Sequence, residues 1–304
     1  MSDSIAETPE PGSRVPTGVA TRVSRRVRRL VAPNPGPFTY TGTCAYIVGE
    51  GEAAIIDPGP AIARHVDALL KAIRGERLVA ILATHTHRDH SPAARALREA
   101  TGAPVLGCAP YAPARGRAEG AHGLDASHDR DYAPDRILED AETLGFAGAT
   151  LDVVATPGHT ANHLCYALRE EGALFTGDHV MGWATTVVAP PDGNMADYMA
   201  SLEKLSGRDD DIYWPAHGEP VRRPRLHVRA LQEHRRQREA AILQRLAAGD
   251  ETIAEIVAQI YAGVDPWLHT AAALNVLAHL EDLCRRGVVA AKDGIKLDGR
   301  YEKP

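Results

Sequence analysis

Short apolar runs, bounded by Gly, Pro or Asp, dominate the first two thirds of the chain. Runs of this length and branching are typical of buried β-strands. They lie at residues 44–48, 53–57, 78–82, 104–106, 150–155, 164–168, 173–176 and 212–214. The first two flank a turn at 49–52, which predicts a hairpin. Between the runs, apolar residues recur at helical spacing, so helices are predicted over about 62–73, after Pro92 and over about 196–205.

The pattern changes to long helical periodicity past Pro224. A charged helix is predicted over 226–246 and a third helix over 268–286. Between them, Thr252 and Glu255 have capping-box spacing and predict the start of another helix. Asp293-Gly294, between apolar residues at 288–290 and 295–297, is a hairpin signal. Three helices and a hairpin are the elements of a winged-helix module.

These patterns divide the chain into three parts. Residues 1–20 are rich in Pro, Ser, Gly and Glu and are predicted to form a flexible tail. Residues 21–224 form the main domain, and residues 225–304 form the winged-helix-like module. Within the main domain, residues 108–145 carry many Pro, Gly and charged residues, which predicts a long excursion of the kind that often carries function.

Near the start of the main domain, arginines alternate with apolar residues. The arginines are Arg22, Arg25, Arg26, Arg28 and Arg29. The segment is either a basic patch or an edge strand with a solvated arginine face, and we favour the edge strand.

Metal-ligand side chains cluster directly after the predicted strand at 78–82. Three imidazoles and a carboxylate fall within six residues, at His85, His87, Asp89 and His90. Neutral imidazole and carboxylate groups are suitable zinc ligands. Three more candidates each follow a predicted strand and are flanked by Gly or Pro: His159, Asp178 and His217. We therefore expect separate loops to converge on one metal site.

Composition and charge narrow the class of protein. The chain has 304 residues, 44% hydrophobic and 24% charged, which is ordinary for a soluble globular protein. A net charge of −6 gives no general attraction to nucleic acid or to an anionic membrane. No apolar run reaches membrane-spanning length. The four cysteines lack CxxC spacing, and no signal-peptide segment precedes the domain, so a cytoplasmic protein with reduced thiols is expected.

The order HxHxDH, His, Asp, His resembles the metallo-beta-lactamase superfamily over about residues 38–220. This resemblance implies an α+β fold, a four-layer αββα sandwich. It also implies two zinc ions, although other divalent transition metals suit the same donors. One ion is assigned to His85, His87 and His159, and the other to Asp89, His90 and His217, with Asp178 as the bridge. Asp89 and Asp178 are therefore the expected catalytic residues.

Two further residues are expected to support the ligands. Metal-bound imidazoles usually donate their second N–H to a carboxylate or carbonyl group. Asp57, at the end of a predicted strand, is a candidate for this role; the alternative is a turn-capping Asp. His163 either lines the site or caps a turn. His128 and His179 are expected to have packing roles.

Within the superfamily, the chain resembles the beta-lactamase-like protein 2 group. The resemblance rests on residues 34–37, 84–92, 134–135, 156–163, 197–199 and 234–239. Animal members of this group resemble endoribonucleases acting on single-stranded RNA. The chain departs from the group at Cys44 and Ala45, where Asn and Thr are usual, which puts the substrate contacts of that loop in doubt.

The resulting hypothesis is a zinc-dependent hydrolase that uses a metal-bridging hydroxide to cleave an ester, thioester or related acyl bond. An endoribonuclease acting on single-stranded RNA at the same site is the alternative. A nucleic-acid-binding regulator is less favoured, because residues 268–275 offer few groups that could read bases, and no specific DNA binding is expected. A metal-stabilised scaffold is disfavoured, because structural sites need no open metal pair. No membrane partner is expected.

Overall fold

The computed structural model describes residues 16–112, 127–146, 148–263 and 265–304. The first half of the main domain forms a mixed seven-stranded sheet whose strands follow one another in chain order. Its strands are β1 (Ala20–Arg22), β2 (Val27–Val31), β3 (Cys44–Glu50), β4 (Glu52–Ile56), β5 (Arg77–Ala83), β6 (Val105–Gly107) and β7 (Arg136–Ile137). Pairing is antiparallel up to β4 and parallel from β4 to β7. The parallel strands β4 and β5 therefore end at the same edge of the sheet.

The second half forms a five-stranded sheet of order β12-β11-β10-β9-β8. Its strands are β8 (Thr143–Phe146), β9 (Ala149–Ala155), β10 (Leu164–Leu168), β11 (Ala173–Gly177) and β12 (Ile212–Pro215). The predicted strands of both halves are present. The excursion at 108–145 also contributes β7 and β8, one to each sheet, while its central part lies outside the described residues.

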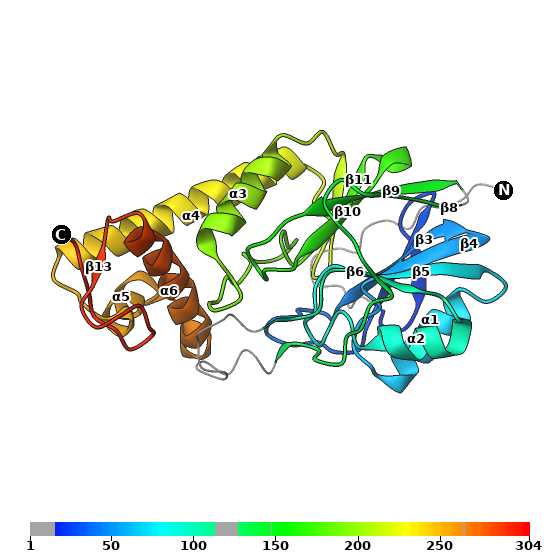
Figure 1. Ribbon diagram of the computed structural model, residues 1–304, viewed down its shortest axis with the longest axis horizontal. Helices are drawn as coiled ribbons and strands as arrows, with labels where there is room; N and C mark the ends of the chain where they lie inside the picture. The colour runs from blue at the N-terminus through cyan, green and yellow to red at the C-terminus, as the bar shows by residue number, and fades with distance from the viewer. Residues whose placement is uncertain (1–15, 113–126, 147, 264) are drawn as a thin grey trace.

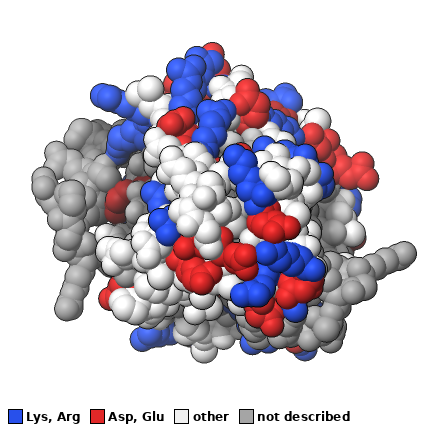
Figure 2. Space-filling view, turned by 90° about the vertical axis from the view of Figure 1, so that its left-hand side faces the viewer, with Lys and Arg blue, Asp and Glu red and all other residues white. Residues whose placement is uncertain are grey.

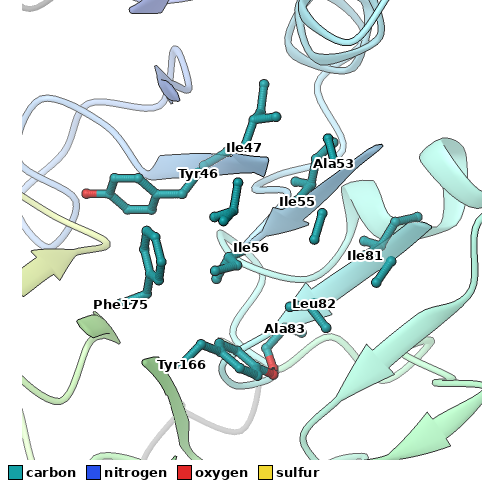
Figure 3. Packing of buried hydrophobic residues seen from close by; sticks show 14 of the residues in the cluster. Tyr46, Ile47, Ala53, Ile55, Ile56, Ile81, Leu82, Ala83, Tyr166 and Phe175 are labelled. Carbon is teal, nitrogen blue, oxygen red and sulfur yellow. The ribbon is translucent and has the colours of Figure 1, made fainter. Parts of the chain in front are cut away.

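The two sheets pack face to face through branched aliphatic and aromatic side chains. Tyr46, Ile56 and Leu82 of the first sheet face Tyr166 and Phe175 of the second (Figure 3). The two tyrosines are fully buried, and each hydroxyl donates to a backbone carbonyl across the interface, at Pro215 and Ala83. Burying these hydroxyls is tolerable because each has a hydrogen-bond partner.

Helices cover the outer faces of the sandwich (Figure 1). The helices α1 (Ala63–Ala72) and α2 (Ala93–Thr101) lie on the first sheet, and α3 (Met195–Ser206) lies on the second. Each turns an apolar face inward, as α3 does with Tyr198, Leu202 and Leu205. This is the predicted four-layer αββα arrangement.

The C-terminal module begins with the long helix α4 (Pro224–Ala247), which runs beside α3 away from the sandwich (Figure 1). It continues with α5 (Ile253–Ile260), a short 3-10 turn at Pro266–Leu268, and α6 (His269–Arg285). The predicted capping box of Thr252 and Glu255 starts α5. Val228 and Leu231 of α4 and Ala278 of α6 join the apolar cluster of α3, so the module packs against the main domain.

The predicted C-terminal hairpin was wrong in its pairing. The strands are β13 (Ala290–Ala291) and β14 (Tyr301–Glu302), and residues 295–297 lie in the connection between them. Tyr301 is fully buried, and its hydroxyl donates to the carbonyl of Lys296 and accepts from the same residue's N–H. Burial of this tyrosine therefore decides the pairing, in preference to the Asp293-Gly294 turn.

The arginine-rich segment forms two antiparallel strands, of which β1 is the edge strand of the first sheet and β2 lies inside it. The expected solvated arginine face was wrong for the arginines of β2. Arg28 forms a half-buried ion pair with Glu76, and Arg29 is buried. Most of the predicted tail lies outside the described residues, although Thr17 already pairs with Val31. Among the described residues, no helix combines the length and apolar character required to cross a membrane.

Candidate metal centre

The loops that follow four strands supply the side chains predicted to bind metal. The loop after β5 carries His85, His87, Asp89 and His90, and the loops after β9, β11 and β12 carry His159, Asp178 and His217. The structure brings all of them together at one end of the sandwich, in two adjoining groups. In each group, one donor atom from every residue lies within 4.8 Å of all the others.

The first group contains His85, His87, His159 and Asp178. The Nδ1 atom of His87 lies 2.9 Å from Nε2 of His85 and 3.2 Å from Nε2 of His159. Three imidazole nitrogens therefore converge on one point. Two neutral nitrogens can share a proton, but three lone pairs meeting in a buried space suit a cation.

The second group contains Asp89, His90 and His217. Nε2 of His217 lies 3.1 Å from Oδ2 of Asp89, and Nε2 of His90 lies 3.3 Å from the same oxygen. The Asp178 carboxylate lies between the groups. Its Oδ2 is 3.6 Å from both His90 and His159, and its Oδ1 is 3.3 Å from His217.

Hydrogen bonds behind the histidines set which ring nitrogen faces the centre. Thr84 donates its hydroxyl to Asp57, so its oxygen accepts from Nδ1–H of His85 at 3.0 Å. Nδ1–H of His90 donates to Asp57 at 3.0 Å, and Nδ1–H of His159 donates to the carbonyl of Val187 at 2.7 Å. In each ring, Nε2 is left with a lone pair that faces the centre, which is the tautomer a metal ligand needs.

Asp57 lies behind His90, in the supporting position expected for it. The carboxylate also accepts from the N–H and hydroxyl of Thr84, both at 2.8 Å. Its backbone has a φ of 48°, a left-handed conformation that costs free energy for residues other than Gly, although Asn and Asp adopt it more readily than most. Such strain persists only where surrounding contacts maintain it. Here the three hydrogen bonds of the carboxylate do so.

His163 lies behind Asp178. Its Nδ1–H donates to Thr156, which leaves Nε2 to accept the N–H of Asp178 at 3.2 Å. His163 thus orients a backbone group rather than facing the centre. His179 packs against Tyr198 with ring centroids 4.7 Å apart, and neither of its ring nitrogens has a hydrogen-bond partner among the described residues.

Burial and neighbouring charges divide the imidazoles into two classes. Burial, followed by the charge that adjacent imidazoles would carry, lowers the pKa of His85 and His87 well below the usual value, which keeps them neutral. Burial also disfavours a charged His90, but the carboxylates of Asp89, Asp178 and Asp57 outweigh it and raise the pKa of His90 well above the usual value. A cation between these side chains would make the same electrostatic contacts as that proton.

The donor set fits divalent metal ions. Nε2 of His90 and Oδ1 of Asp178 are buried and have no hydrogen-bond partner among the described residues. Buried polar atoms in proteins are almost always paired. Imidazole nitrogens and carboxylate oxygens are also the ligands that zinc and similar transition metals prefer.

Several neighbours of the centre were not predicted from the sequence. Thr43 donates to Asp89 at 3.1 Å and accepts from the side-chain amide of Asn34 at 3.0 Å. His128, which was assigned a packing role, lies 3.0 Å from the Thr86 hydroxyl and packs its ring against His87. Asn34 lies in one of the motifs shared with the beta-lactamase-like protein 2 group, and His128 lies in the excursion at 108–145. Neither feature of the sequence predicts which residue the side chain contacts.

Four exposed aromatic side chains form two pairs. Tyr40 and Trp183 stack at 4.9 Å between ring centroids, and Phe38 meets Trp267 of the C-terminal module edge to face at 6.3 Å. Trp183 packs on the backbone of Gly218, the residue that follows His217. The Phe38–Trp267 pair joins the main domain to the C-terminal module, and the Tyr40–Trp183 pair reaches the loop that carries His217.

Comparison with known proteins agrees with this fold. The family described as Metallo-beta-lactamase superfamily matches residues 39–217, and the Beta-lactamase associated winged helix domain matches residues 252–297. The chain is 33% identical over 274 residues to the "Beta-lactamase-like protein 2 homolog" of Caenorhabditis elegans, covering 88% of this chain and 87% of that protein. It is 31% identical over 258 residues to the "Atrochrysone carboxyl ACP thioesterase" of Passalora fulva, covering 79% and 69%.

Solved structures show the same arrangement. A metallo-beta-lactamase family protein from Thermus thermophilus superposes with a TM-score of 0.75 at 25% identity, covering 93% of this chain and 100% of that one. A beta-lactamase domain protein from Burkholderia ambifaria gives a TM-score of 0.79 at 23% identity, covering 95% and 94%. The predicted resemblance and fold class are confirmed, and the chain belongs to the metallo-beta-lactamase superfamily of hydrolases, with the winged-helix domain associated with it.

Proposed function

We propose that this protein is a dinuclear, zinc-dependent hydrolase of acyl thioesters. The observation that carries the proposal is the pair of adjoining His and Asp groups with the Asp178 carboxylate between them. In the described part of the chain, some of their buried ligand atoms have no hydrogen-bond partner. The choice of a thioester is supported by relatives of 30% identity or more that are named atrochrysone carboxyl ACP thioesterases.

In this proposal, His85, His87 and His159 hold one metal ion, and Asp89, His90 and His217 hold the other. Asp178 joins the two groups, as its distances to His90, His159 and His217 suggest. When bound, such a pair of ions activates water at neutral pH and polarises the substrate carbonyl. The imidazoles of His90 and His159 keep their Nδ1 protons during the reaction, because these protons are donated in hydrogen bonds to Asp57 and to the carbonyl of Val187.

The reaction is hydrolysis. Water adds to the acyl carbon, the carbon–sulfur bond breaks, and a carboxylic acid and a thiol are released. A thiol has a pKa of about 8.5, far below that of an alcohol, so it departs without a strong proton donor. The remaining task of the protein is to bind the acyl group. The exposed aromatic pairs Tyr40–Trp183 and Phe38–Trp267 suit an apolar or aromatic acyl chain.

Single-stranded RNA is the less favoured substrate. Aromatic side chains can stack on bases, but RNA binding also depends on phosphate neutralisation. The net charge is −6, and on the face of the C-terminal module Lys and Arg alternate with Asp and Glu (Figure 2). Many of these basic side chains form ion pairs with neighbouring carboxylates, as Arg286 does with Glu239 and Lys292 with Glu251.

The test offers zinc-loaded protein a panel of acyl thioesters and aryl esters beside a labelled, unstructured RNA. We expect thioester turnover, about two zinc ions bound per chain, and loss of turnover to background in Asp178→Asn. Asp209→Asn is the matched control, because that carboxylate is 92% exposed and pairs only with Arg225 in the described structure. RNA cleavage that Asp178→Asn abolishes, without acyl turnover, would reverse the ranking. One tightly bound ion in fully active protein would contradict the dinuclear assignment.

A further inference from the structure

One peptide group connects the metal centre with the C-terminal module. The carbonyl of Val187 accepts Nδ1–H of His159 at 2.7 Å, and the N–H of Val188 donates to Oδ1 of Asn275 on α6 at 3.0 Å. This carbonyl and this N–H belong to the same planar peptide unit. Holding the N–H in one direction therefore also sets the direction of the carbonyl that accepts from His159.

The side chain of Asn275 is itself held in place. Its Nδ2 donates to the carbonyl of Ala271 at 3.0 Å, which assigns the orientation of the amide. Its Oδ1 also accepts from Nη1 of Arg235 on α4 at 3.2 Å. Nη2 of Arg235 donates to the carbonyl of Thr186. Side chains of two helices of the module, α4 and α6, thus form hydrogen bonds with the segment 186–188.

The same segment also contacts the loop that carries Asp178. The hydroxyl of Thr186 donates to the backbone carbonyls of Asp178 at 2.7 Å and of His179 at 3.1 Å. The segment 186–188 therefore contacts two of the proposed metal ligands. It accepts a hydrogen bond from the ring of His159 and donates one to the backbone of Asp178.

Arg235 is an unusual residue to use for packing alone. It is only 3% exposed, its guanidinium lies 5.1 Å from the centroid of the Tyr198 ring, and its hydrogen-bond acceptors in the described part of the chain are the uncharged groups of Asn275 and Thr186. A buried cation without a carboxylate partner costs free energy that an apolar side chain would avoid. An apolar side chain could fill the space, but it could not orient the carbonyl of Thr186 and the amide of Asn275.

We propose that Asn275 and Arg235 are positioning residues for His159, and that the C-terminal module is in this way part of the support of the metal centre. The inference rests on the proposed metal-binding function of His159. Without the acceptor at residue 275, the peptide between Val187 and Val188 can rotate, the ring of His159 loses its fixed direction, and metal binding at its Nε2 weakens.

The experiment measures binding of Co²⁺ to the full-length, metal-free protein by competition with a chelator, together with the visible absorption of the bound ion. Asn275→Leu removes the acceptor at similar volume and is expected to weaken the binding of one ion by about 10- to 100-fold and to shift the absorption bands. Asn275→Asp keeps an oxygen acceptor for Val188 and is expected to bind within about threefold of the unmodified protein, because the peptide stays oriented.

Gln232→Met is the matched control. Gln232 lies on α4 and bonds Glu203 of α3 at 2.8 Å, so the substitution disturbs the junction between module and main domain without touching the segment 186–188. It should leave cobalt affinity and spectrum unchanged. Asn275→Ala removes the acceptor without crowding α6 and serves if the leucine prevents folding. Unchanged affinity and spectrum in the folded Leu or Ala variant would overturn the proposal, even if its melting temperature fell. No substrate enters the measurement, so failure of the thioesterase assay leaves its outcome unaffected.

Discussion

At the scale of single residues, Asp57 shows how strongly the centre depends on groups that would not touch a metal. Its carboxylate accepts three hydrogen bonds, from the N–H and hydroxyl of Thr84 and from Nδ1–H of His90. It makes them from a left-handed backbone conformation, with φ at 48°. Asn adopts this conformation more readily than most residues, so Asp57→Asn changes the charge with little change in backbone strain.

We expect Asp57→Asn to weaken metal binding by about 10- to 100-fold, because the amide cannot accept the proton of His90 as a carboxylate does. Chelator competition with zinc measures the change, and circular dichroism checks the fold. An exposed carboxylate, as in Glu99→Gln, provides the control. Equal zinc affinity of Asp57→Asn and the unmodified protein would contradict the supporting role of Asp57.

At the scale of elements, the loop that carries His159 is packed directly against the start of α3. Gly158 has a φ of 136°, and a Cβ atom there would lie 2.3 Å from the Cα atom of Tyr198. Only glycine allows this approach. Gly158→Ala should therefore destabilise the fold by about 3 kcal/mol or more, since both backbone strain and overlap oppose it. Gly102, at the end of α2, has a φ of 73° and open space around it, so Gly102→Ala should cost only about 1–2 kcal/mol. Urea denaturation compares the two, and equal costs would contradict the contact.

Helix α6 contains a second element-scale test, at His279. Burial, followed by the charge of Arg235, lowers the pKa of this imidazole to about 3. The unfolded chain takes up a proton below a pH of about 6.5, whereas the folded chain keeps the ring neutral. This stabilising contribution is therefore complete above that value, and about 1.4 kcal/mol is lost per pH unit as the pH falls towards 3.

Between about pH 7.5 and pH 5.5, the free energy of unfolding should therefore fall by about 1.4 kcal/mol more in the unmodified protein than in His279→Gln. Comparing the two proteins removes the contributions of other titrating groups. Urea denaturation at both pH values measures the difference. Parallel losses in both proteins would show that His279 does not stay neutral in the folded state.

At the scale of the whole molecule, the C-terminal module buries apolar side chains of α3, the helix that packs on the second sheet. Val228, Leu231 and Ala278 pack with Tyr198 and Leu202 of α3. Chain termination before Pro224 should therefore expose apolar surface, increase the binding of an apolar dye and lower the melting temperature. Leu231→Ala removes one of these contacts and should cost about 2–5 kcal/mol. A truncated protein that stays monomeric, binds no dye and retains its melting temperature would contradict this role.

The sequence by itself determined the features that depend on neighbouring residues. Local apolar periodicity predicts the strands and helices. The candidate metal ligands come directly after strands, in the order typical of the superfamily. Asp178 and His217 follow the parallel strands β11 and β12, which end at the same edge of the second sheet, so their approach to one another follows from that pairing. His85 follows β5 of the first sheet, so only the packing of the two sheets brings it to them. The capping box at Thr252 and Glu255 is equally local, since both partners lie within one helical turn.

Tertiary structure alone decided which groups support the ligands. His159 is held through a backbone carbonyl at Val187, and every residue type carries a carbonyl, so no pattern of side chains could indicate it. Arg29 is buried and the last hairpin is paired around Tyr301, although local charge and turn signals favoured other outcomes. In each case, burial against distant segments outweighs local preference, because packing free energy depends on contacts between residues far apart in the chain.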